Sequence, residues 1–268
     1  MKHRIPLLLV VVLLLLLATS IASAITDGSV PDSGNTRPYV GLMVAFDSAG
    51  QRLWRCSGTL LSSTVFLTAG HCTESPAYRA EIWFDWNVEA GIPGNGYPND
   101  GPAQGLVYTH PEYNPNAFVV RDVGVVVLDG SSVIPSGPYP TLPAQDELDQ
   151  MATRRGRQDV SFTAVGYGLQ RINPVFVEAE RVRYIARPNL IQINTPGFTG
   201  DFSILLTNNH STGGTCFGDS GGPNFIGDSM VVGGVTSFGI NGNCAGTGGV
   251  FRMDRAWARD WVLSFLGG

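Results

Sequence analysis

Residues 216–223 read Cys-Phe-Gly-Asp-Ser-Gly-Gly-Pro, and this stretch decides how the rest of the chain is interpreted. Ser220 stands among glycines, which let the backbone approach a ligand closely and adopt conformations that other residues resist. A carbonyl oxygen resting there can accept hydrogen bonds from the N–H groups of Gly218 and Ser220, which stabilise negative charge as it develops. The stretch therefore predicts Ser220 as a nucleophile, and the alternative is a glycine-rich turn with an incidental serine.

A serine hydroxyl is too weakly acidic to attack alone, so it needs a neighbouring base. Residues 67–72 read Leu-Thr-Ala-Gly-His-Cys and place His71 at the end of an apolar strand, beside a cysteine. The unperturbed pKa of histidine lies close to neutral, which suits a general base. By itself, a histidine next to a cysteine is more often structural than catalytic. The motif around Ser220 favours a catalytic role for His71.

The base in turn needs an acceptor that holds its tautomer, and this acceptor should be a buried carboxylate. Asp122 opens the run Asp-Val-Gly-Val-Val-Val-Leu at 122–128, the most apolar strand after the leader. An acid at such a position is costly to bury unless it is paired. Three other acids compete for the role, but each lies in a more polar or loop-like setting: Asp129, Asp85 and Asp100.

Residues 1–24 differ in chemistry from everything that follows. A basic start at 2–4 precedes an apolar run at 7–18 and the small residues Ala22-Ser23-Ala24. This pattern predicts a secretory signal peptide that is cleaved after Ala24. A membrane anchor is the competing interpretation, but the apolar run is shorter than the ~20 residues of a spanning helix. We expect a secreted, extracellular protein that has no membrane association after signal cleavage.

The cysteines are four in number, which predicts two disulfides in a secretory context: Cys56, Cys72, Cys216 and Cys244. Three pairings are possible on arithmetic alone. Pairing each cysteine with its neighbour in sequence closes two short loops, each of which would stabilise the fold by roughly 3 kcal/mol in the chain-entropy model. A zinc site built from the same four is not expected, because the C-x-x-C spacing is absent.

The composition indicates a folded all-β protein. Hydrophobic residues make up 43% of the chain and charged residues 15%, which excludes a disordered protein. The formal net charge of −5 is mild and scattered, which argues against nucleic acid as a partner. Short apolar runs alternate with Gly, Pro, Asn and Asp and predict strands of a sandwich or barrel. A Pro-rich stretch at 131–143 is suited to a linker that crosses between two halves.

The last residues break the β pattern. From Asp254 onward, Trp257, Trp261 and Phe265 recur every four positions, and two glycines end the chain. This spacing predicts a terminal helix over 254–266, with Asp254 as its N-cap and an aromatic stripe that packs on the body.

Three motifs together resemble the trypsin/chymotrypsin family of serine proteases. They are Thr-Ala-Gly-His-Cys at 68–72, Asp-Val-Gly-Val at 122–125 and Gly-Asp-Ser-Gly-Gly-Pro at 218–223, in the order His, Asp, Ser. Weaker similarities lie at 110–114 and 237–239. Together they span essentially the whole chain after the signal peptide.

The resemblance implies two packed antiparallel six-stranded β-barrels with a short C-terminal helix. In this reading a peptidase domain spans 25–268, with an N-terminal barrel over 25–135, a C-terminal barrel over 140–253 and the helix over 254–266. It also implies a catalytic triad, an oxyanion hole made by the N–H groups of Gly218 and Ser220, and two disulfides. The triad would be His71, Asp122 and Ser220, and the disulfides would be Cys56–Cys72 and Cys216–Cys244.

In the family, the amino group of a newly exposed isoleucine inserts next to the acid that precedes the nucleophile and shapes the oxyanion hole. Asp219 holds the position of that acid, and Ile25 directly follows the predicted cleavage site. We therefore hypothesise that removal of the signal peptide itself creates the activating terminus.

The primary specificity pocket is predicted from the same resemblance. Cleavage after Arg or Lys would need a carboxylate six residues before the nucleophile, where this chain has Gly214. The matching walls are Gly239 and Gly249, so the pocket is expected to be open and uncharged. Such a pocket favours large hydrophobic residues, or a broad range of residues, before the cleaved bond.

Two other functions compete with the endopeptidase. One is a binding protein on the same scaffold that has lost its chemistry, because function lies in the site and not in the fold. The other is an esterase or another acyl hydrolase, because the same machinery cleaves esters. We expect a monomer that acts on protein or peptide substrates and requires no cofactor or metal.

Overall fold

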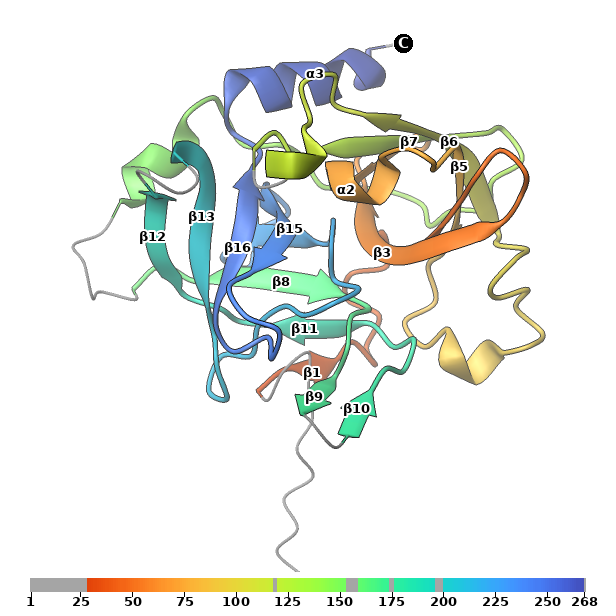
Figure 1. The fold of residues 1–268 in the computed structure, drawn as a ribbon, viewed down its shortest axis with the longest axis horizontal. Coiled ribbons are helices and arrows are strands. Elements are labelled where there is room, and N and C mark those ends of the chain that lie inside the picture. Colours follow the sequence, from red (N-terminus) through yellow and green to blue (C-terminus); the bar gives the residue numbers. More distant parts are fainter. Residues whose placement is uncertain (1–27, 118–119, 153–158, 174–175, 196–199, 268) are drawn as a thin grey trace, which may run out of the picture.

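The computed structural model describes residues 28–267 except for 118–119, 153–158, 174–175 and 196–199. Two β-sheet halves lie side by side, and the C-terminal helix runs along one side of them (Figure 1). The predicted signal peptide and Ile25 lie outside the described residues. Among the described helices, none has the length and apolar character needed to cross a membrane.

The first half is a closed antiparallel barrel in the order β2-β3-β4-β7-β6-β5. Its strands are rich in Val, Leu and Phe, and they pack around an apolar interior because these side chains are more stable away from water. Every residue of β2 and β4 is buried. The strands are β2 (Val40–Phe46), β3 (Arg52–Leu60), β4 (Val65–Thr68), β5 (Arg79–Trp83), β6 (Ala103–Thr109) and β7 (Gly124–Leu128). The short helices are α2 (Gly70–Thr73), η1 (Glu89–Gly91) and η2 (Pro115–Ala117).

The second half is a curled eight-stranded sheet in the order β1-β11-β8-β14-β15-β16-β13-β12. Its strands are β1 (Val30–Pro31), β8 (Phe162–Gly166), β11 (Tyr184–Ala186), β12 (Leu190–Thr195), β13 (Gly200–Asn208), β14 (Pro223–Ile226), β15 (Val232–Gly239) and β16 (Gly246–Arg252). A separate hairpin joins β9 (Arg171–Asn173) to β10 (Phe176–Glu178), and η3 (Glu147–Met151) precedes β8.

The all-β fold is therefore as the resemblance implies, but the second half differs from a continuously closed six-stranded barrel. β11 pairs with β8 at one side of the sheet, whereas β12 pairs with β13 at the other. Only the three residues 187–189 separate β11 from β12, and the middle one is Pro188, which has no N–H to donate to a ladder. The segment 184–195 thus supplies β11 near one end of the sheet and β12 at the other end, in place of a single closing strand.

The predicted C-terminal helix is present as α3 (Ala256–Leu266). Its aromatic stripe packs on both halves of the molecule. The ring of Trp257 lies 5.0 Å from that of Phe251 in β16, and the ring of Phe265 lies 5.4 Å from that of Tyr108 in β6. The helix therefore holds the two sheets together along one side (Figure 1).

The N-cap prediction for this helix was wrong. The capping position belongs to Arg255, and the Asp254 carboxylate makes no cap. Instead Asp254 is fully buried, 2.6 Å from the Nη2 atom of the equally buried Arg252, and it also accepts the backbone N–H of Leu148. A buried guanidinium binds a carboxylate more strongly than a helix terminus does, so the local capping signal loses to the tertiary partner.

A second buried ion pair ties the start of the described chain to both halves. The Arg183 side chain is fully buried, and its Nε lies 2.9 Å from Oδ2 of Asp32. Its Nη1 donates to the carbonyl oxygens of Val40 and Phe84 in the first half and to the hydroxyl of Tyr167 in the second. Because all these partners are buried, the pair depends on every one of them being in place.

We predict that Asp32→Ala destabilises the protein by about 3–5 kcal/mol, because it leaves the Arg183 charge buried and unpaired. The measurement is urea unfolding followed by circular dichroism. Asp260→Ala is the matched control, since Asp260 pairs with Arg259 at 3.3 Å on the surface, with 66% of its side chain exposed. This control should change stability by no more than about 0.5 kcal/mol. Equal effects of the two variants would contradict the prediction.

Candidate active site

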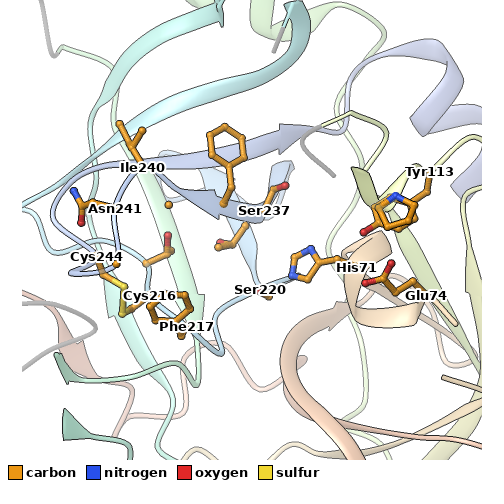
Figure 2. Close-up of a pocket in the computed structure, with 16 residues that line it drawn as sticks. His71, Glu74, Tyr113, Cys216, Phe217, Ser220, Ser237, Ile240, Asn241 and Cys244 are labelled. Atoms are coloured by element: carbon orange, nitrogen blue, oxygen red, sulfur yellow. A yellow bond between two sulfur atoms is a disulfide. The ribbon is translucent and has the colours of Figure 1, made fainter. Parts of the chain in front are cut away.

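A cavity of about 630 Å³ opens between the two halves. The first half contributes His71, Glu74, Tyr113 and Pro115 to its wall. The second half contributes Thr215, Cys216, Phe217, Ser220, Thr236, Ser237, Phe238, Gly239, Ile240, Asn241, Gly242 and Cys244. Figure 2 shows His71, Glu74 and Tyr113 on one side and Phe217, Ile240 and Asn241 on the other, with Ser220 between them.

The first half brings His71 and Asp122 together. β4 pairs with β7 up to the register Thr68 opposite Gly124, so the residues just beyond these two ends are neighbours. Asp122 accepts the backbone N–H of His71 at Oδ1, at 2.8 Å, and its Oδ2 lies 2.9 Å from Nδ1 of the ring. This two-point contact fixes both the backbone and the ring. Because Nδ1 is engaged, Nε2 is the nitrogen left to exchange a proton with another group.

The Asp122 carboxylate is fully buried and also accepts a hydrogen bond from the Ser237 hydroxyl in β15. A residue of the second half thus completes the environment of a carboxylate in the first. In the sequence, Ser237 stood out only as a weak family similarity. The competing acids lie elsewhere: Asp85 and Asp100 line a separate pocket, and Asp129 accepts hydrogen bonds from serines near the surface.

The pKa of His71 reflects opposing effects. Burial lowers the pKa, but the negative charge of Asp122 and its hydrogen bond raise it, and the charge of Glu74 raises it further. The net result is a pKa above the ordinary value of 6.5. A neighbouring carboxylate that raises the pKa of an imidazole also stabilises the imidazolium whenever the ring takes up a proton.

Ser220 lies close to the His71 segment because a disulfide and a strand meet there. The Cys72 sulfur lies 3.6 Å from the carbonyl oxygen of Ser220, and Ser57 in β3 donates its backbone N–H to the same oxygen at 2.8 Å. A ring nitrogen of His71 and the sulfur atoms of Cys56 and Cys72 lie within 4.8 Å of one another. These sulfur atoms are bonded together, so they offer no thiolate to a metal.

The structure contains the disulfides Cys56–Cys72 and Cys216–Cys244, which are the pairs that the resemblance implies. The first joins β3 to α2, beside His71. The second joins the segment before Ser220 to the loop after β15, and both of its cysteines line the cavity. The second disulfide is therefore part of the cavity wall, and the first lies next in sequence to His71, which lines the cavity.

The backbone around Ser220 has a distinctive hydrogen-bond pattern. The N–H groups of Asp219, Gly221 and Gly222 donate to backbone oxygens within the chain. Over the part of the chain that the structure describes, the N–H groups of Gly218 and Ser220 donate to no protein acceptor. Gly218 adopts a φ of +96°, a conformation that favours glycine. The arrangement leaves two nearby N–H groups for an external oxygen.

Asp219 is fully buried and turns away from Ser220. Its carboxylate accepts the backbone N–H of Gly168 at 2.8 Å and that of Cys216 at 2.9 Å. Burial raises its pKa to about 7, although these N–H groups and the charge of Arg55 lower it. The predicted docking partner, Ile25, is outside the described residues, so the insertion of the amino terminus next to Asp219 stays a prediction.

Of the three predicted pocket glycines, Gly239 lines the cavity and the other two lie behind its wall. A Cβ on Gly249 would lie 2.2 Å from the Phe238 ring, and a Cβ on Gly214 would lie 2.3 Å from the Asn208 side chain. Packing by these two larger side chains was not visible in the sequence. Because the Phe238 ring covers Gly249, Phe238 forms this part of the cavity wall.

The wall opposite His71 is uncharged. Among the lining residues, only Glu74 and His71 are ionisable at neutral pH, and both belong to the first half. Phe217 and Ile240 are 57% and 56% exposed at the rim. Neither residue was predicted as part of the site, although Phe217 stands next to a half-cystine in the motif that contains Ser220. Exposed apolar side chains at a cavity rim favour contact with an apolar ligand.

Comparison with known proteins identifies relatives that match most of the chain. A family model described as Trypsin matches residues 27–262. A collagenase from Hypoderma lineatum is 23% identical over 218 residues, which are 81% of this chain and 78% of that protein. Trypsin delta from Drosophila melanogaster is 27% identical over 214 residues, 78% of each protein.

Solved structures share the fold. The structure of HL collagenase has a TM-score of 0.66 and 21% identity, covering 90% of this chain and 99% of the other. Human heparin binding protein has a TM-score of 0.64 and 18% identity, covering 90% of this chain and 97% of the other. At these identities the likeness shows the architecture alone.

We predict that NMR titration gives His71 a pKa above 6.5 in the wild-type protein. Asp122→Asn should bring the pKa below 6.5, because it removes the negative charge while burial persists. Glu74→Gln should lower the pKa by a smaller amount. The pKa of His110, which burial holds below 6.5, serves as an internal control and should not move. An unchanged His71 pKa in Asp122→Asn would rule out this account of the site.

Proposed function

The chain belongs to the trypsin family, and from this premise we propose that it is a secreted serine endopeptidase. In this proposal the catalytic triad is His71, Asp122 and Ser220. The observation that carries it is the contact of the His71 ring with the buried Asp122 carboxylate, in the wall of the same cavity that holds Ser220. The nearby unused N–H groups of Gly218 and Ser220 support the same chemistry.

The proposed reaction begins when Oγ of Ser220 attacks the carbonyl carbon of a peptide bond. Nε2 of His71 takes the hydroxyl proton, and the Asp122 carboxylate stabilises the resulting imidazolium. The carbonyl oxygen becomes an oxyanion that accepts the N–H groups of Gly218 and Ser220. The imidazolium then gives its proton to the leaving amine, which leaves an acyl group on Ser220. Water hydrolyses this ester by the same steps.

The first step requires a neutral imidazole, so the pKa of His71 sets the acid limit of activity. Because the Asp122 charge keeps that pKa above 6.5, protonation blocks the base at and below mildly acidic pH. The same raised pKa makes the ring a better proton acceptor above this limit. The enzyme we propose therefore acts at neutral to alkaline pH.

For the substrate, we propose large hydrophobic or aromatic residues before the cleaved bond. The support is the uncharged wall opposite His71, with Phe217 and Ile240 at its rim and Phe238 within it. Thr215 lies in the wall next to Gly214, so neither residue offers a carboxylate to a lysine or arginine side chain. An apolar side chain loses little by leaving water for such a site, whereas a charged one would be left unpaired.

We propose secretion on the basis of the leader sequence and the two disulfides, since disulfides persist in oxidising compartments. We further propose that cleavage after Ala24 frees the amino group of Ile25 to dock beside Asp219. Among the described residues, the Asp219 carboxylate forms no ion pair, and burial raises its pKa although two backbone N–H groups and the charge of Arg55 lower it. An inserted ammonium group would supply a cationic partner.

A binding protein without catalysis is the main rival, because proteins that share this fold include one named for heparin binding. The sequence retains a histidine, an aspartate and a serine at the three motif positions, and that favours the enzyme. An esterase is the other rival, since an acyl-serine mechanism also hydrolyses esters.

We predict that the purified wild-type protein cleaves denatured casein and that Ser220→Ala lowers the rate by at least about 10³-fold, because no other group can form the acyl intermediate. Ser211→Ala, in an exposed loop, is the matched control and should keep full activity. A fluorophosphonate reagent should label the wild type and Ser211→Ala but not Ser220→Ala.

Each alternative gives a different result in this assay. Absence of both cleavage and labelling would identify a binding protein. Labelling together with hydrolysis of ester substrates, but no cleavage of protein, would identify an esterase. Either outcome would overturn the endopeptidase proposal.

We predict that peptides with Phe, Tyr or Leu before the cleaved bond give a kcat/KM at least about tenfold above that for Arg or Lys. Thr215→Asp should narrow or reverse this preference, because it adds a carboxylate to the cavity wall. The measurement is hydrolysis of a matched peptide panel that differs at this one residue. Preferred cleavage after Arg or Lys by the wild type would refute the specificity proposal.

A further inference from the structure

The directions of the two unused N–H groups depend on the peptide planes on either side of Asp219. In a trans peptide the N–H and the C=O lie in one plane and point in opposite directions. The N–H of Gly218 shares its plane with the carbonyl of Phe217, and the N–H of Ser220 shares its plane with the carbonyl of Asp219. A protein that holds these two carbonyl oxygens therefore also aims the two N–H groups.

Backbone groups hold both oxygens. Leu169 donates its N–H to the carbonyl oxygen of Phe217 at 2.9 Å, and Gly222 donates to that of Asp219 at 2.8 Å. The planes that carry the two unused N–H groups are thus each fixed from the side opposite the N–H. The plane between them, which joins Gly218 to Asp219, determines how the two are oriented relative to each other.

A side chain fixes this central plane. Its N–H donates to the carbonyl oxygen of Cys216 at 3.0 Å, and its carbonyl oxygen, that of Gly218, accepts the Ser57 hydroxyl at 2.9 Å. Gly218 has no side chain to restrict rotation, and its φ of +96° is one that few other residues adopt. The plane consequently depends on its hydrogen bonds to stay in place.

Ser57 is well placed to provide the hydrogen bond. It is fully buried in β3, and its Oγ accepts the backbone N–H of Tyr167 at 3.0 Å. A hydroxyl has one proton, so with that acceptor site filled the proton is directed to the Gly218 oxygen. The backbone N–H of Ser57 also donates to the carbonyl oxygen of Ser220. One residue of the first half thus holds the loop of the second half at two points.

We propose that Ser57 is a positioning residue whose hydroxyl holds the Gly218 peptide so that both N–H groups face the substrate carbonyl oxygen. Ser57 touches neither the substrate nor the reacting atoms, and it acts through the loop alone. The inference rests on the proposed hydrolase function, since it concerns the stabilisation of the oxyanion in that reaction. Loss of the Ser57 hydroxyl should therefore weaken transition-state binding more than substrate binding.

The test compares Ser57→Ala with wild type on the same peptide substrate. We expect kcat to fall by about 10- to 100-fold, less than the loss of an entire oxyanion donor, while KM stays within about twofold. A peptide aldehyde forms a hemiacetal whose oxygen occupies the oxyanion site, so its inhibition constant should rise in parallel with the loss in kcat. If the substitution only destabilised the protein, the molecules that remain folded would keep the kcat and the aldehyde inhibition constant of the wild type.

Thr59→Val is the matched control. Thr59 is a buried residue of the same strand, and its hydroxyl donates to the backbone oxygens of Tyr39 and Leu60, its hydrogen-bond acceptors among the described residues. This variant should keep kcat and aldehyde inhibition within about twofold of wild type. Ser57→Gly is the second variant if Ser57→Ala does not fold, because it leaves room for a water to bridge Tyr167 and Gly218. We expect the kcat of Ser57→Gly to lie between those of Ser57→Ala and wild type. If the kcat of Ser57→Ala cannot be measured, the kcat of Ser57→Gly should be at least threefold below that of Thr59→Val.

The outcomes separate this inference from the function on which it rests. An active wild type with unchanged kcat in the Ser57 variants would overturn the positioning role and leave the endopeptidase standing. Equal losses in kcat and in substrate affinity, with unchanged aldehyde inhibition, would overturn it as well. A wild type that neither cleaves substrate nor reacts with a serine reagent would overturn the proposed function and this inference together.

Discussion

The buried carboxylate of Asp122 couples the packing of the two halves to the geometry of the candidate active site. Asp122 is fully buried between the two halves, and a buried charge is tolerated only when hydrogen bonds replace its lost water. Those hydrogen bonds come from the backbone and ring of His71 in the first half and from Ser237 in the second. The same hydrogen bonds therefore hold the two sheets together and orient the side chains of the candidate active site.

The two halves contribute different parts of the proposed chemistry. The first half is a closed barrel that carries the base and its carboxylate, and the second supplies the loop of Ser220 and most of the cavity wall. Besides the contact of Ser237 with Asp122, connections between the halves include the Ser57 hydroxyl, the buried Arg183 side chain and the aromatic stripe of α3. Because the cavity lies between the two halves, a small relative shift would separate the proposed base, His71, from the proposed nucleophile, Ser220.

Sequence patterns predict most of the fold, and the exceptions have identifiable causes. Apolar runs between turn residues indicate the strands, and a four-residue aromatic spacing indicates α3. Asp254 carries the local signal of an N-cap but pairs instead with Arg252, which lies beside it only after folding. The space behind Gly214 and Gly249 is likewise filled by Asn208 and Phe238, which come to lie against these glycines only after folding.

The family motifs, the all-β class and the residue types that suit acyl transfer could be predicted before the structure was known, because these properties follow from local order and composition. The contacts between distant groups became visible in the folded protein: Ser237 with Asp122, Ser57 with Gly218, and Phe238 over Gly249. The physical reason is that hydrogen bonds and packing act over a few ångströms in space. Contacts between segments that are far apart along the chain therefore leave no periodic or local mark in the sequence.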